Sequence, residues 1–179
     1  MGGPDRILYS VDASALMDFD HVYPSDVFPS LWELLHALAS EQRLWMSGFA
    51  RDECHDDSLK AFLKRHTAMV VEQAEYDPWV SGLVAAETHL RIRVASPELT
   101  KTVADPFVIA LALYLDGRDP KDVMRRADPT ASCFVLSEEK RNTRLPRGGI
   151  RTKIPDICDQ LSLGYVSILE FLRHEGYSG

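Results

Sequence analysis

A chain of 179 residues with 45% hydrophobic content is long enough to bury a substantial core, so we expect one soluble domain over residues 1–179. The net charge of −7 argues against a protein that coats nucleic acid indiscriminately, and the three cysteines lack the CxxC spacing of a zinc knuckle or the even number of a disulfide framework. No apolar stretch is long enough to span a membrane, and the first residues do not read as a signal peptide, so the expected location is the cytoplasm.

Short apolar runs alternate with longer helical patterns along the chain, which favours an α/β fold. Buried strands are predicted at 7–11, 43–47, 133–136 and 165–168. Helices are predicted from near Ala13, from near Pro29, over 50–63, over much of 79–93, from Asp105, over 155–163 and over 169–175. The helix from Pro29 has apolar residues at 31, 34, 35 and 38, and the last two helices are predicted to end at Gly164 and Gly176. Strands separated by helices imply a parallel sheet, whose ligands bind at the carboxyl ends of the strands.

An acidic residue, Asp12, directly follows the first predicted strand. Taken alone, it is best interpreted as the N-cap of the helix that begins near Ala13, because aspartate often caps helices. Asp12 is not isolated, however, because other acids follow or flank the predicted strands in the same way: Glu53, Asp105, Glu138 and Glu139. Each can be explained as a cap or as a first-turn acid favoured by the helix dipole. If they converge, their mutual repulsion calls for a cation, and carboxylate oxygens suit Mg²⁺ or Mn²⁺.

The order and spacing of these segments resemble PIN-domain ribonucleases, including the VapC-type toxins of toxin–antitoxin modules. The resemblance rests on VDAS at 11–14, SGFARDE at 47–53, ADPFVIALA at 104–112 and VLSEE at 135–139. YPSDVFPSLW at 23–32 and KIPDIC at 153–158 look like a PIN-like subfamily. The resemblance implies a three-layer α/β/α fold around a central parallel sheet of four or five strands.

The same resemblance assigns metal binding to Asp12, Glu53 and Asp105. The fourth acid departs from the family's Thr/Ser-x-Asp pattern, because Ser137-Glu138-Glu139 stands there instead. Glu139 is preferred for this role, Asp156 is second and Glu138 third, with Ser137 as a secondary residue. Ser14 is expected to orient a metal-bound water or phosphate, or else to bond within the first turn of its helix.

The activity implied by the resemblance is Mg²⁺- or Mn²⁺-dependent endoribonuclease cleavage that leaves a 5′-phosphate and a 3′-hydroxyl. Family members commonly form homodimers, and toxin members are inhibited by a cognate antitoxin protein, so both partners are expected. One alternative is a non-catalytic PIN-like scaffold that binds RNA or protein. Another is an aspartyl-phosphate phosphatase, which the serine at position 14 disfavours because such enzymes carry a second aspartate there. The RNA target and the antitoxin are not specified by the sequence.

One basic segment, 140–153, contains six basic residues and no acid. Its glycines and Pro146 indicate an irregular loop. The side chains proposed to attract an RNA backbone are Arg141, Arg144, Arg147, Arg151 and Lys153. A solvated loop and an antitoxin docking site are the other interpretations. The three tryptophans lie in apolar patterns and are assigned to core packing.

Overall fold

The computed structural model of the chain describes residues 6–90, 105–125, 133–140 and 153–177. Within them, five parallel strands form a sheet in the order β3-β2-β1-β4-β5. The strands are β1 (Leu8–Val11), β2 (Leu44–Ser47), β3 (Val70–Val71), β4 (Cys133–Leu136) and β5 (Gly164–Val166). Because β1 lies in the middle, with β2 and β4 as neighbours, Asp12 leaves the sheet at its centre.

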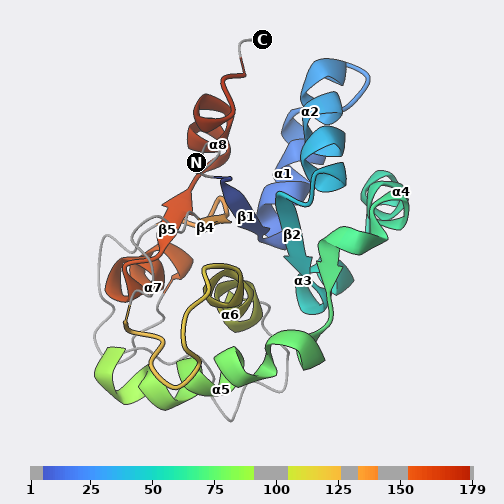
Figure 1. The fold of residues 1–179 in the computed structure, drawn as a ribbon. Coiled ribbons are helices and arrows are strands. Elements are labelled where there is room, and N and C mark those ends of the chain that lie inside the picture. Colours follow the sequence, from blue (N-terminus) through green and yellow to red (C-terminus); the bar gives the residue numbers. More distant parts are fainter. Residues whose placement is uncertain (1–5, 91–104, 126–132, 141–152, 178–179) are drawn as a thin grey trace, which may run out of the picture.

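Helices cover both faces of the sheet (Figure 1). α1 (Ala13–Val22), α2 (Pro29–Ser40) and α8 (Ile168–His174) lie on one side, and α6 (Asp105–Leu115) and α5 (Gln73–Leu90) lie on the other. The remaining elements are α3 (Gly48–Glu53), α4 (Asp57–Arg65), the 3₁₀ turn η1 (Thr67–Met69) and α7 (Ile154–Leu161). The α/β fold with three layers and a five-stranded sheet confirms the predicted fold class.

α6 is apolar on nearly all sides, which allows it to be enclosed between the sheet and α5. Its residues from Val108 to Leu113 are fully buried, and it contacts β1, β2 and β4 on one side and α5 on another. Ser10 of β1 donates a hydrogen bond from its hydroxyl to the Val108 carbonyl oxygen at 2.8 Å. The start of α6 is thereby tied to the end of β1, next to Asp12.

The single helix predicted over 50–63 is wrong. The chain forms α3 and α4 instead, because Cys54 and Asp56 adopt extended backbone angles between them. The helix predicted over 79–93 also begins earlier, since α5 starts at Gln73 and contains Pro78 in its interior. Residues 91–93 lie outside the described part of the chain.

Gly164 does not end a helix, as the sequence suggested, but opens β5. α7 ends before Ser162, which takes the left-handed conformation with φ of 49°. A Cβ at Gly164 would lie 2.5 Å from Cδ1 of Phe134, so the glycine permits close packing of β5 on β4. Ile168, predicted as strand, is the first residue of α8, and the stop at Gly176 is confirmed by its positive φ of 64°.

Candidate functional site

Asp12 occupies the N-cap position of α1 but does not perform the capping role. Its backbone is extended, and its side chain does not accept the hydrogen bond that defines a side-chain cap of α1, although the backbone N–H of Ala13 bonds to it. The carboxyl group is buried, with 4% of the residue exposed. A buried acid that is not used as a cap needs another explanation, because burying a carboxylate destabilises its charged form.

Two hydroxyl groups hold the Asp12 carboxylate. Ser14 Oγ and Ser137 Oγ both donate to Asp12 Oδ2, the second at 2.9 Å. Burial raises the pKa of Asp12, the two hydroxyl hydrogen bonds oppose that rise, and the charge of Glu139 adds to it. In this structure Ser14 therefore bonds to its neighbouring acid, and both serines orient the carboxylate.

The turn after β4 is fixed by contacts to its backbone and side chains. Tyr165 on β5 donates from its hydroxyl to the carbonyl oxygens of Ser137 and Glu139, at 2.8 and 2.5 Å. Glu139 accepts from Lys153 Nζ at 2.5 Å and from the backbone N–H of Ile154 at 2.9 Å. Each carboxylate oxygen of Glu139 thus already accepts a hydrogen bond. Glu139 therefore adds negative charge near Asp12, but neither of its oxygens is left unbonded to serve as a metal ligand.

Glu53 is the last residue of α3, which begins directly after β2. Its side chain is exposed, and it lies beside the buried Cys54. The pKa of the Cys54 thiol is raised to about 12, first by burial and then by the charges of Glu53 and Asp12. The structure therefore places Glu53 at the end of α3 away from β2, with its side chain exposed.

Asp105 is the first residue of α6, and the structure describes its place in that helix but not its side chain. The Ser10–Val108 hydrogen bond positions the start of α6 close to the end of β1. The elements that carry Asp12, Asp105 and Glu139 therefore begin or end at the carboxyl edge of the sheet, and α3, which carries Glu53, starts there. Among the described residues, the ligand atoms of Asp12, Glu53 and Glu139 do not all lie within 4.8 Å of one another.

The other two acids considered for the fourth ligand act at helix ends. Asp156 accepts a 3.4 Å hydrogen bond from the backbone N–H of Lys153 at the start of α7. Glu138 accepts a 2.5 Å hydrogen bond from the backbone N–H of Ile168 at the start of α8. These contacts explain both residues without a metal, because they satisfy N–H groups that a helix leaves unpaired.

The predicted RNA-binding arginines, Arg141, Arg144, Arg147 and Arg151, lie outside the described residues. Lys153 is described, and its ammonium group is bonded to Glu139 with 28% of the side chain exposed. In this arrangement the Lys153 ammonium group neutralises the charge of Glu139. Lys153 could contact RNA only after this ion pair breaks.

A different group of possible metal ligands lies between α1 and α4. Among the described residues, Asp20, His21 and Asp56 are the group of three whose ligand atoms lie within 4.8 Å of one another. His21 Nε2 is 3.4 Å from Asp56 Oδ2, and Ser58 donates to Asp20 Oδ2 at 2.7 Å. No sequence motif indicates this group, because Asp56 follows Asp20 and His21 by more than 30 positions and lies at the start of a separate helix.

The remaining cysteine, tryptophan and tyrosine side chains pack within the core or at its border. The three cysteines are free and buried. Trp32 is buried, and Trp45 and Trp79 are partly buried against the core, which confirms their packing role. Tyr165, which holds the turn at Ser137 and Glu139, was missed because nothing in a single strand indicates the turn that it will contact. No helix in the described part is long and apolar enough to cross a membrane.

Comparison with known proteins relates the chain to one family. No curated protein and no solved structure matches it. A family model described as a domain of unknown function (DUF4411) matches residues 9–118. The matched segment contains Asp12, Glu53 and Asp105, whereas Glu139 and Asp156 lie beyond it. Because the match covers more than half of its length, the chain belongs to the DUF4411 family.

Proposed function

We propose that the chain is an endoribonuclease that depends on Mg²⁺ or Mn²⁺. The observation that carries the proposal is the Asp12 carboxylate, which is buried at the end of the central strand, held by two hydroxyl groups and not used as a helix cap. Such an orientation stabilises an ionised ligand at a site where burial alone would favour the neutral acid.

The donor chemistry at this edge fits a hard divalent cation. Asp12 and Glu53 offer carboxylate oxygens, and α6 begins with a third acid, Asp105, at the same edge. Magnesium and manganese prefer oxygen ligands. Burial, and to a smaller extent the charge of Glu139, raises the pKa of Asp12, and a bound cation would oppose this rise by favouring the ionised carboxylate. When bound, such an ion supplies an activated water and stabilises charge on the leaving oxygen of a phosphodiester.

The protein's own residues would prepare the site for that reaction. Ser14 and Ser137 keep the Asp12 carboxylate in one orientation, and Lys153 fixes the position of the Glu139 side chain after β4. Cleavage is proposed to leave a 5′-phosphate and a 3′-hydroxyl. The similarity of the acids' order to PIN-domain toxins supports a further proposal, that the chain is the toxin of a toxin–antitoxin pair with a cognate antitoxin and a homodimeric state.

The experiment incubates wild type and Asp12→Asn with single-stranded and total RNA, in Mg²⁺, in Mn²⁺ and in EDTA. Asp26→Asn is the matched control, because Asp26 is an exposed aspartate outside the acidic edge. We expect metal-dependent cleavage by wild type and Asp26→Asn, and in Asp12→Asn a loss at least as large as the roughly 10–100-fold that follows when a hydrogen-bond partner of a metal ligand is removed. Cleavage by Asp12→Asn at the wild-type rate contradicts the proposal. Absence of both cleavage and metal binding in wild type favours a non-catalytic scaffold.

A further inference from the structure

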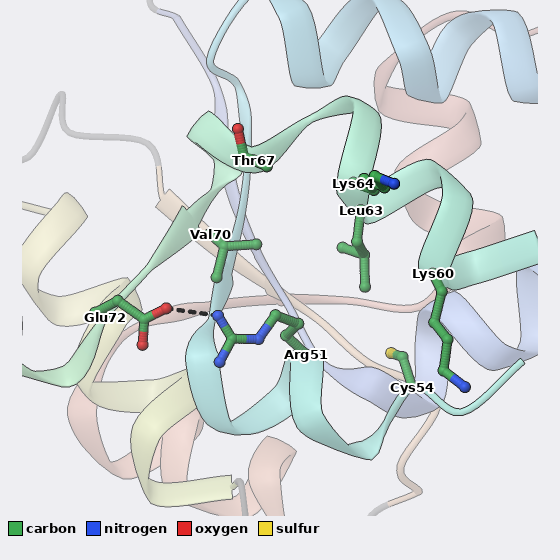
Figure 2. Close-up of a pocket in the computed structure, with 8 residues that line it drawn as sticks. All are labelled: Arg51, Cys54, Lys60, Leu63, Lys64, Thr67, Val70 and Glu72. Atoms are coloured by element: carbon green, nitrogen blue, oxygen red, sulfur yellow. Dashed lines mark hydrogen bonds and ion pairs between the residues drawn. The ribbon is translucent and has the colours of Figure 1, made fainter. Parts of the chain in front are cut away.

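A cavity of about 370 Å³ lies between α3, α4 and the residues around β3 (Figure 2). Its volume falls within the roughly 300–1,000 Å³ that is usual for small-molecule sites. Cys54, Leu63 and Val70 line it with apolar surface, and in Figure 2 these side chains point toward the same space. The cavity therefore offers a hydrophobic wall to a ligand.

The polar residues of the cavity are mostly cationic. Arg51, Lys60 and Lys64 line it together with one carboxylate, Glu72, which leaves a formal excess of two positive charges. This local excess stands out in a chain whose net charge is −7. Positive charge beside an apolar wall favours an anionic ligand that also carries a flat or apolar part.

Arg51 is held in place by two carboxylates. Its Nη1 lies 2.5 Å from Glu72 Oε1, and its Nε lies 2.9 Å from Asp52 Oδ1. These hydrogen bonds raise the pKa of Arg51 above its already high value. Gly48 leaves room for this pair, because a Cβ there would lie 2.6 Å from Glu72 Oε2. Arg51 is thereby a fixed part of the wall.

The two lysines on α4 are less committed and stand on the side of the cavity opposite the Arg51–Glu72 pair (Figure 2). Lys60 Nζ is 3.9 Å from Asp57, a loose contact between exposed groups. Among the described residues, no carboxylate forms an ion pair with Lys64. An incoming phosphate would therefore displace little when it binds these lysines.

The cavity adjoins the acidic edge through Cys54. This residue lines the cavity and directly follows Glu53, the last residue of α3. We propose that the cavity binds one nucleotide unit of the RNA strand, with its base or ribose on the apolar wall and its phosphate at Lys60 and Lys64. This inference rests on the proposed nuclease function and assigns part of its substrate site.

The test titrates adenosine 5′-monophosphate and cytidine 5′-monophosphate into the full chain by calorimetry, in EDTA so that metal plays no part. The variant is Lys60→Ala with Lys64→Ala, and the control is Lys121→Ala, which removes an exposed lysine away from the cavity. We expect wild type and control to bind both nucleotides, the double variant to bind them about tenfold more weakly, and affinity to fall with salt. Equal binding by wild type and the double variant would overturn the assignment, as would no binding by wild type at millimolar nucleotide.

A second comparison separates this site from the nuclease proposal. If both are correct, RNA cleavage by the double lysine variant shows a raised KM with kcat little changed, because the lysines contact substrate away from the reacting phosphate. Nucleotide binding without any RNA cleavage by wild type supports the cavity and overturns the nuclease. Metal-dependent cleavage without nucleotide binding supports the nuclease and overturns the cavity assignment.

Discussion

Ser137 Oγ lies 2.9 Å from Asp12 Oδ2 and donates a hydrogen bond to it, joining the ends of β4 and β1 across 125 positions of sequence. The same hydroxyl oxygen accepts the backbone N–H of Glu139 at 3.1 Å. One fully buried side chain therefore orients the central acid and fixes the turn that carries Glu139. The candidate site is organised by this serine as much as by its acids.

Replacing Ser137 with alanine should destabilise the protein. The change leaves the Glu139 N–H without its acceptor and removes one of the two hydroxyl donors to Asp12, at a cost of about 1–3 kcal/mol. The free energy of unfolding, measured with urea at neutral pH, should fall by that amount. Ser40→Ala, an exposed serine at the end of α2, should change it little. A Ser137→Ala protein as stable as wild type would contradict the orienting role.

Asp12→Asn should not lower stability in the absence of metal. Because burial raises the pKa of Asp12, the folded state binds its proton more tightly than the unfolded state does. The stability that Asp12 contributes is thus greatest at acidic pH and is lost as the pH rises through its raised folded pKa. Asparagine retains an oxygen acceptor for Ser14 and Ser137 and removes the buried charge.

Thermal unfolding in EDTA at pH 7.5 measures this effect. We expect the midpoint of Asp12→Asn to equal that of wild type or to exceed it by about 2–4 °C, the shift that about 1 kcal/mol produces in a chain of this size. Below the usual aspartate pKa the difference should vanish, because the acid is then protonated in both states. A marked fall in the midpoint would show that the charged carboxylate stabilises the fold.

The paired imidazoles of His36 and His66 predict a loss of stability in acid. Nδ1 of His36 lies 2.6 Å from Nε2 of His66, so one of these two nitrogens must be unprotonated and accept a hydrogen bond from the N–H of the other. Burial lowers both pKa values, and His36 further lowers that of His66. The unfolded state binds protons first as the pH falls below about 6.5, so the free energy of unfolding should decrease there.

Urea unfolding between pH 8 and pH 5 tests this expectation. His36→Gln should flatten the decrease in stability, whereas His55→Gln, at an exposed histidine, should leave the profile of wild type. An identical pH profile in His36→Gln and wild type would contradict the assignment of the decrease to this pair.

Arg118 should be the most sensitive charged residue of the described core. It is 2% exposed and donates to Asp116 Oδ2 at 2.9 Å, as well as to three carbonyl oxygens near the ends of α7 and the 118–123 turn. Arg118→Met leaves Asp116 buried without its partner and should lower the free energy of unfolding by about 3–5 kcal/mol. Arg125→Met, at an exposed arginine, is the control. A loss below 1 kcal/mol would contradict this role.

The strands β1, β2 and β4 and the acids that follow them were predictable from the sequence, because each strand is a short apolar run that ends at a polar residue. The apolar run before Asp12, the run before Ser47 and the run before Ser137 each became a strand, and parallel pairing brought their ends together. Val11 pairs with Met46 and Leu136, which sets the register of the acidic edge.

Other features depend on tertiary contacts that local patterns do not contain. Val70–Val71 is too short to predict as a strand and exists because β2 offers it an edge. The roles of Ser137 and Tyr165 depend on partners in other strands, and the Arg51–Glu72 pair joins residues 21 positions apart. The cavity between α3 and α4 also required the break at Cys54–Asp56, which the apolar pattern over 50–63 concealed.

The most direct test of the central claim, that the carboxylates at the carboxyl edge of the sheet hold the divalent ion, is calorimetric titration of Mn²⁺. Wild type, Asp12→Asn and Asp20→Asn are compared at neutral pH, since Asp20 belongs to the separate group with His21 and Asp56. We expect Asp12→Asn to lose Mn²⁺ binding and Asp20→Asn to bind Mn²⁺ as wild type does. Unchanged binding in Asp12→Asn, with loss in Asp20→Asn, would contradict this claim and place the ion between α1 and α4.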